Sequence, residues 1–588
     1  MYKILDISFC LTLLFTAMKK ISAIIIASMI AAGIVSCDHD DITPDESNTA
    51  LTPEELAKRN NQPSNNDDPA NNPGGNDTPQ SNWKVVNTAD ERADDEIAVA
   101  IDAANVFQTI EGFGASDCWL GEYVGTKYAD KDKMAKLLFS QDTLSDGSVE
   151  GIGLSMWRVN LGAGSAEQGD DSKLEDVTRR AECYLKADGT TYDWSKCVGQ
   201  RYFMEEAKKY GVEKMLLFSN SPLVFWTKNG KAFDDKTDDV NLTEEGYEKF
   251  AEYLAEVSKH FTDNGINIDY ISPLNEPQYE WAGGQEGSSW RNSEIAKFVK
   301  ILDEKLGSQK TEIVVPEAGK WSATYSSSEY ANSGSQISEL FGSGDNSIAE
   351  LSHVHKVVAA HSYWEDRNWD ALESYRSKAY NEAKSHGIGL WQTEWSMLDE
   401  YAATDNYPGL AEAKYIDNAL FLARVIYSDL VWANVSSWSY WTVWGQERWS
   451  QKNRFWLIKL GADVEDYHDT YDDITGGANW KDNANLYVLG NYSRFVRPGY
   501  KRVDMNCGAD KSFVGTAFVS GDGNTLVAVY TNLGDQKIRV NPTVTGFDGA
   551  NKVLRFVTDE TKKLERTNMS DGNVVVPAKS VTTVVYCK

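Results

Sequence analysis

Basic residues are scarce in this sequence relative to acidic ones. Its 588 residues include 58 lysines and arginines against 88 aspartates and glutamates, which gives a formal net charge of -30. Because phosphate backbones and anionic lipid surfaces are bound by clustered Lys and Arg, this balance argues against a nucleic-acid partner and against electrostatic attachment to a membrane.

The chain also lacks the motifs of several catalytic classes. It has no Gly-rich phosphate loop and no nucleophile elbow around a serine. His353, His355 and His361 lie close together, but no acid or Cys completes a recognisable zinc-binding spacing with them. We therefore expect neither a cofactor nor a metal ion.

The first 37 residues are expected to be a lipoprotein signal segment. Met18-Lys-Lys precedes an apolar run from Ile21 to Val35, which has the length of a signal-peptide core and is short for a membrane span. Ile34-Val-Ser-Cys37 resembles a bacterial lipobox, which would make Cys37 the lipidated first residue of the mature protein. The alternative is a plain signal peptide with an incidental Cys.

The residues after Cys37 point to an exported protein on a tether. The aspartates that follow resemble the signal that exports lipoproteins to the cell surface in Bacteroidetes, so we expect an outer-membrane lipoprotein at the cell surface or in the periplasm, attached only by lipid. Residues 38–82 are rich in Asn, Pro, Asp, Ser and Gly, which predicts a disordered tether. Trp83-Lys-Val-Val and Ile97-Ala-Val-Ala-Ile101 then predict strands, and we expect residues 83–106 to join a β-domain at the end of the chain.

Residues 107–483 alternate strand-like and helix-like segments. This alternation is typical of βα units, and eight of them fit an α/β fold of the (β/α)8 TIM-barrel type. The expected strands are Thr109–Gly114, Leu154–Val159, Lys214–Phe218, Ile268–Ser272, Glu312–Val315, Val357–His361, Gly389–Thr393 and Val435–Trp441.

Residues 484–588 show short apolar strands separated by turns such as Gly-Asp-Gly. This pattern predicts an appended antiparallel β-sandwich domain. The expected strands are Phe513–Val519, Thr525–Tyr530, Lys537–Val540, Val553–Val557, Val574–Val576 and Val581–Tyr586.

Two glutamates directly follow strands of the expected barrel. Glu276 lies in Ile268-Asp-Tyr-Ile-Ser-Pro-Leu-Asn-Glu-Pro277, and Glu394 ends Gly389-Leu-Trp-Gln-Thr-Glu394. Catalytic groups of such barrels lie at the carboxyl ends of the strands, and two facing carboxylates can cleave a glycosidic bond as acid and nucleophile. A surface loop acid that caps a nearby helix is the alternative for Glu276.

Four motifs in order resemble glycoside hydrolase family 30, and within it the endo-β-1,6-galactanase-like branch. They are Glu111-Gly-Phe-Gly114, Trp157-Arg-Val-Asn160, Asn275-Glu-Pro277 and Gln392-Thr-Glu394. The resemblance implies that Glu276 is the general acid/base and Glu394 the nucleophile of a retaining enzyme. It also implies that Asn275 binds the 2-hydroxyl, that Arg158 lies near Glu394, and that Tyr363 hydrogen-bonds the nucleophile.

Other candidate contacts with substrate come from the ends of the strands. The first motif continues as Ala115-Ser-Asp117 instead of the common Gly-Phe-Gly-Gly form, which leaves Asp117 and Trp119 as plausible contacts. Glu317 is a third acid at the same face, to which the family pattern gives no catalytic role. Tryptophans just after strands are candidate walls of a sugar site, with packing under a loop as the alternative for each: Trp119, Trp281, Trp395 and Trp444, and also Trp226, Trp321 and Trp364.

Five cysteines remain after the lipidated one. Export permits disulfides, and the expected pairs are Cys183 with Cys197 and Cys507 with Cys587, which leaves Cys118 free. Buried unpaired thiols are the alternative.

The predicted function is hydrolysis of a β-linked polysaccharide, with endo-β-1,6-galactanase as the implied specificity. Alternatives within the family are a β-1,6-glucanase, a xylanase or an exo-β-glycosidase. An alternative from another class is a non-catalytic glycan-binding surface lipoprotein.

Overall fold

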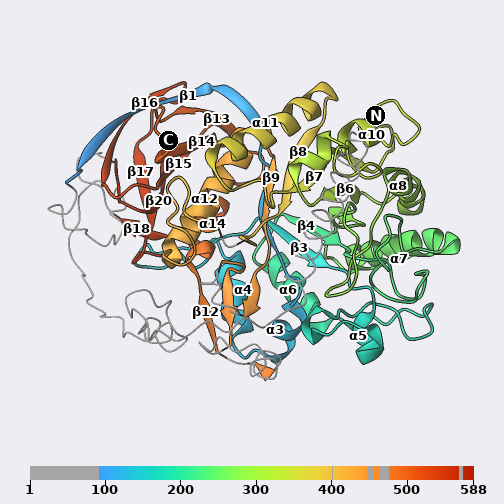
Figure 1. Cartoon of the computed structure of the whole chain (residues 1–588). Helices are drawn as coiled ribbons and strands as arrows, with labels where there is room; N and C mark the ends of the chain where they lie inside the picture. The colour runs from blue at the N-terminus through green and yellow to red at the C-terminus, as the bar shows by residue number, and fades with distance from the viewer. Residues whose placement is uncertain (1–91, 400, 447–453, 462–475, 478, 568–573) are drawn as a thin grey trace, which may run out of the picture. The chain divides into compact units, whose positions relative to one another are not determined.

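Eight parallel strands form a closed barrel in the computed structural model, as predicted (Figure 1). The structure describes residues 92–399, 401–446, 454–461, 476–477, 479–567 and 574–588. Each predicted barrel strand overlaps an observed one, and β2 pairs with both β3 and β9 to close the ring. The barrel strands are β2 (Gly112–Ser116), β3 (Met156–Asn160), β4 (Lys214–Phe218), β5 (Tyr270–Ser272), β6 (Glu312–Ala318), β7 (Val354–His361), β8 (Gly389–Glu394) and β9 (Ser437–Tyr440).

Alternation along the strands separates the inside of the barrel from its helix-covered outside. On β3, Trp157 and Val159 belong to the large apolar core, whereas Met156 belongs to a separate core cluster with Leu216 of β4. Because side chains two residues apart on a strand share a face, Arg158 lies on the same side as Met156. The sequence of β3 therefore places the Arg158 cation inside the barrel, two residues nearer than Met156 to the carboxyl end of the strand.

The helices follow the strands in the order expected of βα units. Thr243 and Asn368 cap the helices that follow them, through backbone N–H groups of Gly246 and Ala371. None of the helices in the described ranges is both long enough and apolar enough to cross a bilayer. In the part of the chain that the structure describes, the α-helices are α3 (Gly121–Lys127), α4 (Lys131–Phe139), α5 (Ser165–Gln168), α6 (Val198–Lys209), α7 (Glu244–Asp263), α8 (Asn292–Leu306), α9 (Trp321–Tyr325), α10 (Gln336–Phe341), α11 (Trp369–Ser385), α12 (Tyr415–Val431) and α14 (Ala484–Ser493), with 3-10 turns at Gly169–Ser172 and Val177–Arg179.

The strands of the C-terminal region form one continuous nine-stranded sheet, mostly antiparallel and curled (Figure 1). Its order is β18-β17-β20-β15-β14-β13-β1-β16-β19, and β1 pairs antiparallel with β13 and parallel with β16. The strands are β1 (Asp95–Thr109), β13 (Lys501–Asn506), β14 (Phe513–Val519), β15 (Thr525–Asn532), β16 (Ile538–Thr545), β17 (Lys552–Thr558), β18 (Glu565–Thr567), β19 (Val574–Val576) and β20 (Ser580–Cys587), and a separate small sheet contains β10 (Trp444–Gln446), β11 (Ile458–Leu460) and β12 (Trp480–Asp482).

Helix α14 lies at the start of the region that was expected to contain only strands. The side chains of its residues 485–493 are buried, and Asn491 bonds to Thr558 of β17 and Thr583 of β20. A helix that is covered all round shows no amphipathic pattern, which is why its sequence did not indicate a surface helix. The signal segment with Cys37, the tether and the strand predicted at Trp83 lie outside the described residues.

The predicted disulfides are wrong, since all five described cysteines are free. The thiol of Cys183 points to Glu167 and the Leu185 carbonyl, and that of Cys197 to the Glu182 carbonyl. The other two lie at different levels along the strands. Cys507 lies beside Gly515, which pairs with Tyr530, and Tyr530 pairs with Thr582 of β20. Cys587 is five residues further along β20, about 16 Å at the rise of a strand.

Candidate active site

Five buried ionisable side chains meet at the carboxyl ends of the barrel strands. They come from five segments of the barrel: Arg158 from β3, Glu276 from the loop after β5, Glu317 from β6, His361 from β7 and Glu394 from β8. Each is 6% exposed or less. Charges this far from water require partners, and each of them has at least one within the group.

Glu394 is held by two hydrogen-bond donors, one for each carboxylate oxygen. Arg158 donates to Oε2 at 3.0 Å, and the Tyr363 hydroxyl donates to Oε1 at 3.0 Å. The guanidinium is itself fixed, because it lies 3.6 Å from the centre of the Phe218 ring. Two donors aimed at one carboxylate are the environment of an ionised group.

Glu276 is held in a different environment. Its backbone has φ of 43°, in the left-handed region that non-glycine residues avoid, and the turn is fixed by a 2.9 Å hydrogen bond from its N–H to the Glu317 carbonyl. Burial raises the pKa of its carboxyl group, although the bond from His361 opposes that effect. A carboxyl group that retains its proton near neutral pH can act as a general acid.

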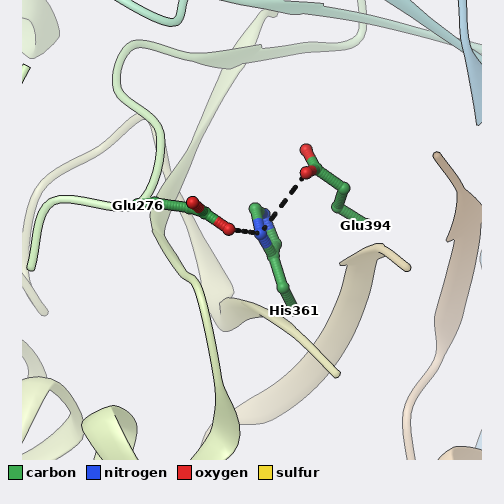
Figure 2. A group of neighbouring side chains, drawn as sticks. All are labelled: Glu276, His361 and Glu394. Carbon is green, nitrogen blue, oxygen red and sulfur yellow. Dashed lines mark hydrogen bonds and ion pairs between the residues drawn. The ribbon is translucent and has the colours of Figure 1, made fainter. Parts of the chain in front are cut away.

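His361 bridges two of the glutamates. Its Nδ1 lies 2.8 Å from Glu276 Oε1 and its Nε2 lies 3.1 Å from Glu317 Oε2 (Figure 2 shows the first contact). Burial by itself would lower the pKa of this imidazole, but Glu394, Glu276 and Glu317 outweigh it and raise the pKa. These acids favour the imidazolium form of His361, in which one N–H group donates to a carboxyl oxygen of Glu276 and the other to the Glu317 carboxylate.

Glu317 completes the charge balance of the cluster. Burial opposes its ionisation, but Arg158, at 3.4 Å, and His361 lower its pKa to about 2, with a further bond from the Thr393 hydroxyl. With Glu276 protonated, two carboxylates then face two cations and the buried group is neutral. This is the state expected to dominate in a site that excludes water.

The same geometry bears on metal binding. Ligand atoms of Glu276, His361 and Glu394 all lie within 4.8 Å of one another, a spacing that could suit an ion. A metal ligand must be an unprotonated imidazole nitrogen, whereas both nitrogens of His361 contact oxygens of glutamates, Glu276 and Glu317. The imidazolium thus takes the position that a cation would occupy.

The model of O-glycosyl hydrolase family 30 matches residues 96–450 of this chain. The chain belongs to glycoside hydrolase family 30. An endo-β-1,6-galactanase of Hypocrea rufa is 24% identical over 369 residues, which cover 60% of this chain and 68% of the relative. A glucuronoxylanase of Bacillus subtilis is 22% identical over 345 residues, 58% of this chain and 66% of the relative. The crystal structure of a conserved exported protein from Bacteroides fragilis is 28% identical with a TM-score of 0.76, and covers 83% of this chain and 100% of that one.

Two more of the predicted site residues lie beside the cluster in this family 30 protein. Asn275 is 3% exposed and its Oδ1 accepts a 3.3 Å hydrogen bond from Arg158. Tyr363 binds Glu394, as described above. Asp117 has other partners: its two carboxylate oxygens accept hydrogen bonds from the Asn160 N–H at 2.8 Å and from the Gln200 side chain at 3.0 Å. Both of its oxygens are thus engaged by other parts of the chain.

The predicted tryptophans divide into two groups. Trp119 and Trp281 are partly exposed, so they retain ring surface for a ligand. Trp395 and Trp444 are each 1% exposed and correct that expectation. Trp395 stacks on Phe421 and donates to Asp366, whereas Trp444 packs against Trp157 and Phe203. A covered ring cannot serve as a sugar platform.

Sequence reasoning missed the role of His361 and left that of Glu317 open. His361 ends β7 two residues before Tyr363, so its position at the carboxyl end of a strand was the available signal. Glu317 follows Pro316 on β6. Neither residue type nor spacing showed that the imidazole would lie between two acids, because the two come from different strands.

Proposed function

We propose that this family 30 chain is a retaining glycoside hydrolase with Glu276 as general acid/base and Glu394 as nucleophile. The observation that carries the proposal is the contrast between the partners of two buried carboxyl groups: burial raises the pKa of Glu276, which His361 contacts, whereas Glu394 accepts hydrogen bonds from Arg158 and Tyr363. The nearest ligand oxygens of the pair are within 4.8 Å. An upper limit of this size supports a retaining pair, about 5–5.5 Å apart, over an inverting pair at about 6.5–9.5 Å.

The reaction proceeds in two displacements. Glu394 attacks the anomeric carbon as the glycosidic bond breaks, and Glu276 transfers its proton to the departing oxygen. The result is a glycosyl ester on Glu394 and a carboxylate on Glu276. Glu276 then takes a proton from water as that water attacks the anomeric carbon, which releases Glu394 and restores the starting protonation.

His361 and Arg158 position the two acids and balance their charges. When Glu276 loses its proton in the first step, Glu394 loses its negative charge to the ester bond, so the buried group remains neutral throughout. His361 holds Oε1 of Glu276 and leaves Oε2 for proton transfer. Asn275, bound to the same guanidinium as Glu394, is placed to hydrogen-bond the 2-hydroxyl beside the reacting carbon.

The proposed substrate is β-1,6-linked galactan, and the proposed location is outside the cell. The similarity to the Hypocrea rufa galactanase supports the substrate, and the exported Bacteroides fragilis protein supports export. The proposal of Cys37 as a lipid anchor rests on the Ile34-Val-Ser-Cys37 motif. The relative from Bacillus subtilis makes xylan the second candidate. Incubation with galactan, β-1,6-glucan and glucuronoxylan separates these candidates by their products, and tight binding without turnover would favour a glycan-binding protein.

The roles of the two glutamates are tested with paired variants. We expect Glu276→Gln and Glu394→Gln each to reduce hydrolysis of the natural glycan by about 1,000-fold or more. With an activated aryl glycoside and azide, Glu394→Gly should give a glycosyl azide of inverted configuration, whereas Glu276→Gly should give one of retained configuration. Near-normal rates in either glutamine variant, or the same azide product from both glycine variants, would refute the assignment.

A further inference from the structure

A group of aromatic side chains lies beside Glu276 and has no part in the two displacements. Tyr279 is its centre, with ring centroids 6.0 Å from Trp281, 6.3 Å from Tyr330 and 5.6 Å from Trp364, all edge to face. We name these four residues the Tyr279 cluster. Its members come from the chain segments that follow three different strands, β5, β6 and β7.

The Tyr279 cluster is fixed to the segment that carries Glu276. The Tyr279 N–H and the Trp281 indole both donate to the Glu276 carbonyl, at 3.2 and 3.3 Å. A methyl group added at Gly319 would lie 2.7 Å from the Tyr279 ring and 3.1 Å from Glu276 Oε1. The tyrosine ring and the carboxyl group therefore lie against the same point of the backbone.

Trp364 presents an exposed ring within this cluster. It is 42% exposed, which is unusual for a tryptophan that contacts two other aromatic rings, Tyr279 and Tyr363. Its φ of 61° lies in the left-handed region, a costly conformation for a bulky residue that is found most often at functional sites. An exposed indole face offers an apolar platform, and the C–H face of a sugar ring is such a ligand.

A different set of rings lies near Arg158, which binds Glu394. Trp441 is 5.9 Å from the guanidinium of Arg158 and 6.1 Å from Trp119. The Glu276 segment thus bonds to the Tyr279 cluster and Arg158 has Trp441 beside it, while Trp364 also contacts Tyr363, which binds Glu394. Because the general acid must reach the leaving oxygen, the sugar beyond that oxygen lies on the side of Glu276.

We propose that the Tyr279 cluster binds the sugar on the leaving-group side of the scissile bond, with Trp364 as its stacking surface. The inference rests on the proposed role of Glu276 as the acid. By microscopic reversibility the same site receives an incoming sugar acceptor, so the protein should transfer glycosyl groups to sugars in competition with water. Aromatic neighbours on both sides of the pair fit cleavage within a chain.

The test compares Trp364→Ala with the unchanged protein on two substrates that share the same glycone. One substrate has a sugar leaving group and the other a nitrophenyl leaving group. We expect the ratio of kcat/KM for the oligosaccharide to kcat/KM for the aryl glycoside to fall about ten-fold or more. The fraction of glycosyl groups transferred to added galactose should fall likewise, while transfer to methanol relative to water stays constant.

Phe107→Ala is the matched control. Phe107 is 41% exposed but lies on β1 of the C-terminal sheet, so it should change neither ratio. An unchanged substrate ratio in Trp364→Ala, or equal losses of transfer to galactose and methanol, would overturn the proposal. If the unchanged protein cleaves glucan or xylan instead of galactan, the substrate proposal fails, and the same ratios measured on that glycan still test the site.

Discussion

Two buried glutamates should make the stability of this protein depend on pH in opposite directions. Glu317 and Glu286 are both fully buried, yet the pKa of Glu317 is lowered to about 2 whereas burial raises that of Glu286 to about 7. The difference lies in their partners. Arg158 and His361 outweigh the burial of Glu317, whereas Glu286 accepts hydrogen bonds from neutral groups, the Ser165 hydroxyl and the Ala163 N–H.

The size of each effect follows from the shift of the pKa. Each value differs by 2.5 units from the ordinary value of 4.5, since 4.5 − 2 = 2.5 and 7 − 4.5 = 2.5, which corresponds to about 3 kcal/mol. A lowered pKa contributes stability that is present above pH 4.5 and fades as the pH falls towards 2. A raised pKa contributes stability that is present below pH 4.5 and is lost as the pH rises to 7.

The assay is guanidinium unfolding of Glu317→Gln and Glu286→Gln between pH 3.5 and 8, followed by tryptophan fluorescence. We expect Glu317→Gln to cost about 3 kcal/mol at pH 6 and about 2 kcal/mol at pH 3.5. The free energy of unfolding of Glu286→Gln, relative to that of the unchanged protein, should rise by about 3 kcal/mol as the pH goes from 4.5 to 7. Each variant is the control for the other, because both replace a buried carboxyl group by an amide of the same shape.

The reasoning would be refuted by differences in unfolding free energy that do not change with pH. It would also fail if Glu317→Gln were neutral or stabilising at pH 6, since Glu317 would then not be an ionised partner of Arg158 and His361. A gain for Glu286→Gln that appeared below pH 4.5 would contradict the opposite assignment for that residue.

Two further predictions concern other parts of the chain. His355 lies between Glu111 and Glu312 at 2.8 and 3.1 Å, and burial, which lowers its pKa, is outweighed by these acids, which raise it. His355→Gln should therefore be less stable than the unchanged protein below about pH 6.5, and this difference should shrink as the pH rises. Thermal unfolding of both proteins at pH 5 and pH 9 tests this, and an equal difference in stability at the two pH values would contradict it. Cys37→Ala should release the protein from the membrane fraction of the producing cell, and continued membrane attachment in a fractionation experiment would exclude a lipid on Cys37.

The fold and the principal acids were accessible from the sequence because both depend on local patterns. Each barrel strand is a short apolar segment followed by turn or helix signals, and Glu276 and Glu394 directly follow two of them. A parallel barrel brings the carboxyl ends of all its strands together, so the positions of the acids within their strands were enough to predict that they meet. Helix α14 escaped prediction because it is buried on every side.

Tertiary structure alone decided how the charges are paired and which aromatic rings remain exposed. The imidazole of His361 reaches Glu276 and Glu317 across 85 and 44 residues of sequence, and these acids, with Glu394, raise its pKa against the effect of burial. Trp395 and Trp364 both follow barrel strands, yet the first is 1% and the second 42% exposed. The sequence determined which residues arrive at the barrel mouth through strand periodicity, whereas burial, charge balance and ring exposure depend on contacts between loops that are distant in sequence.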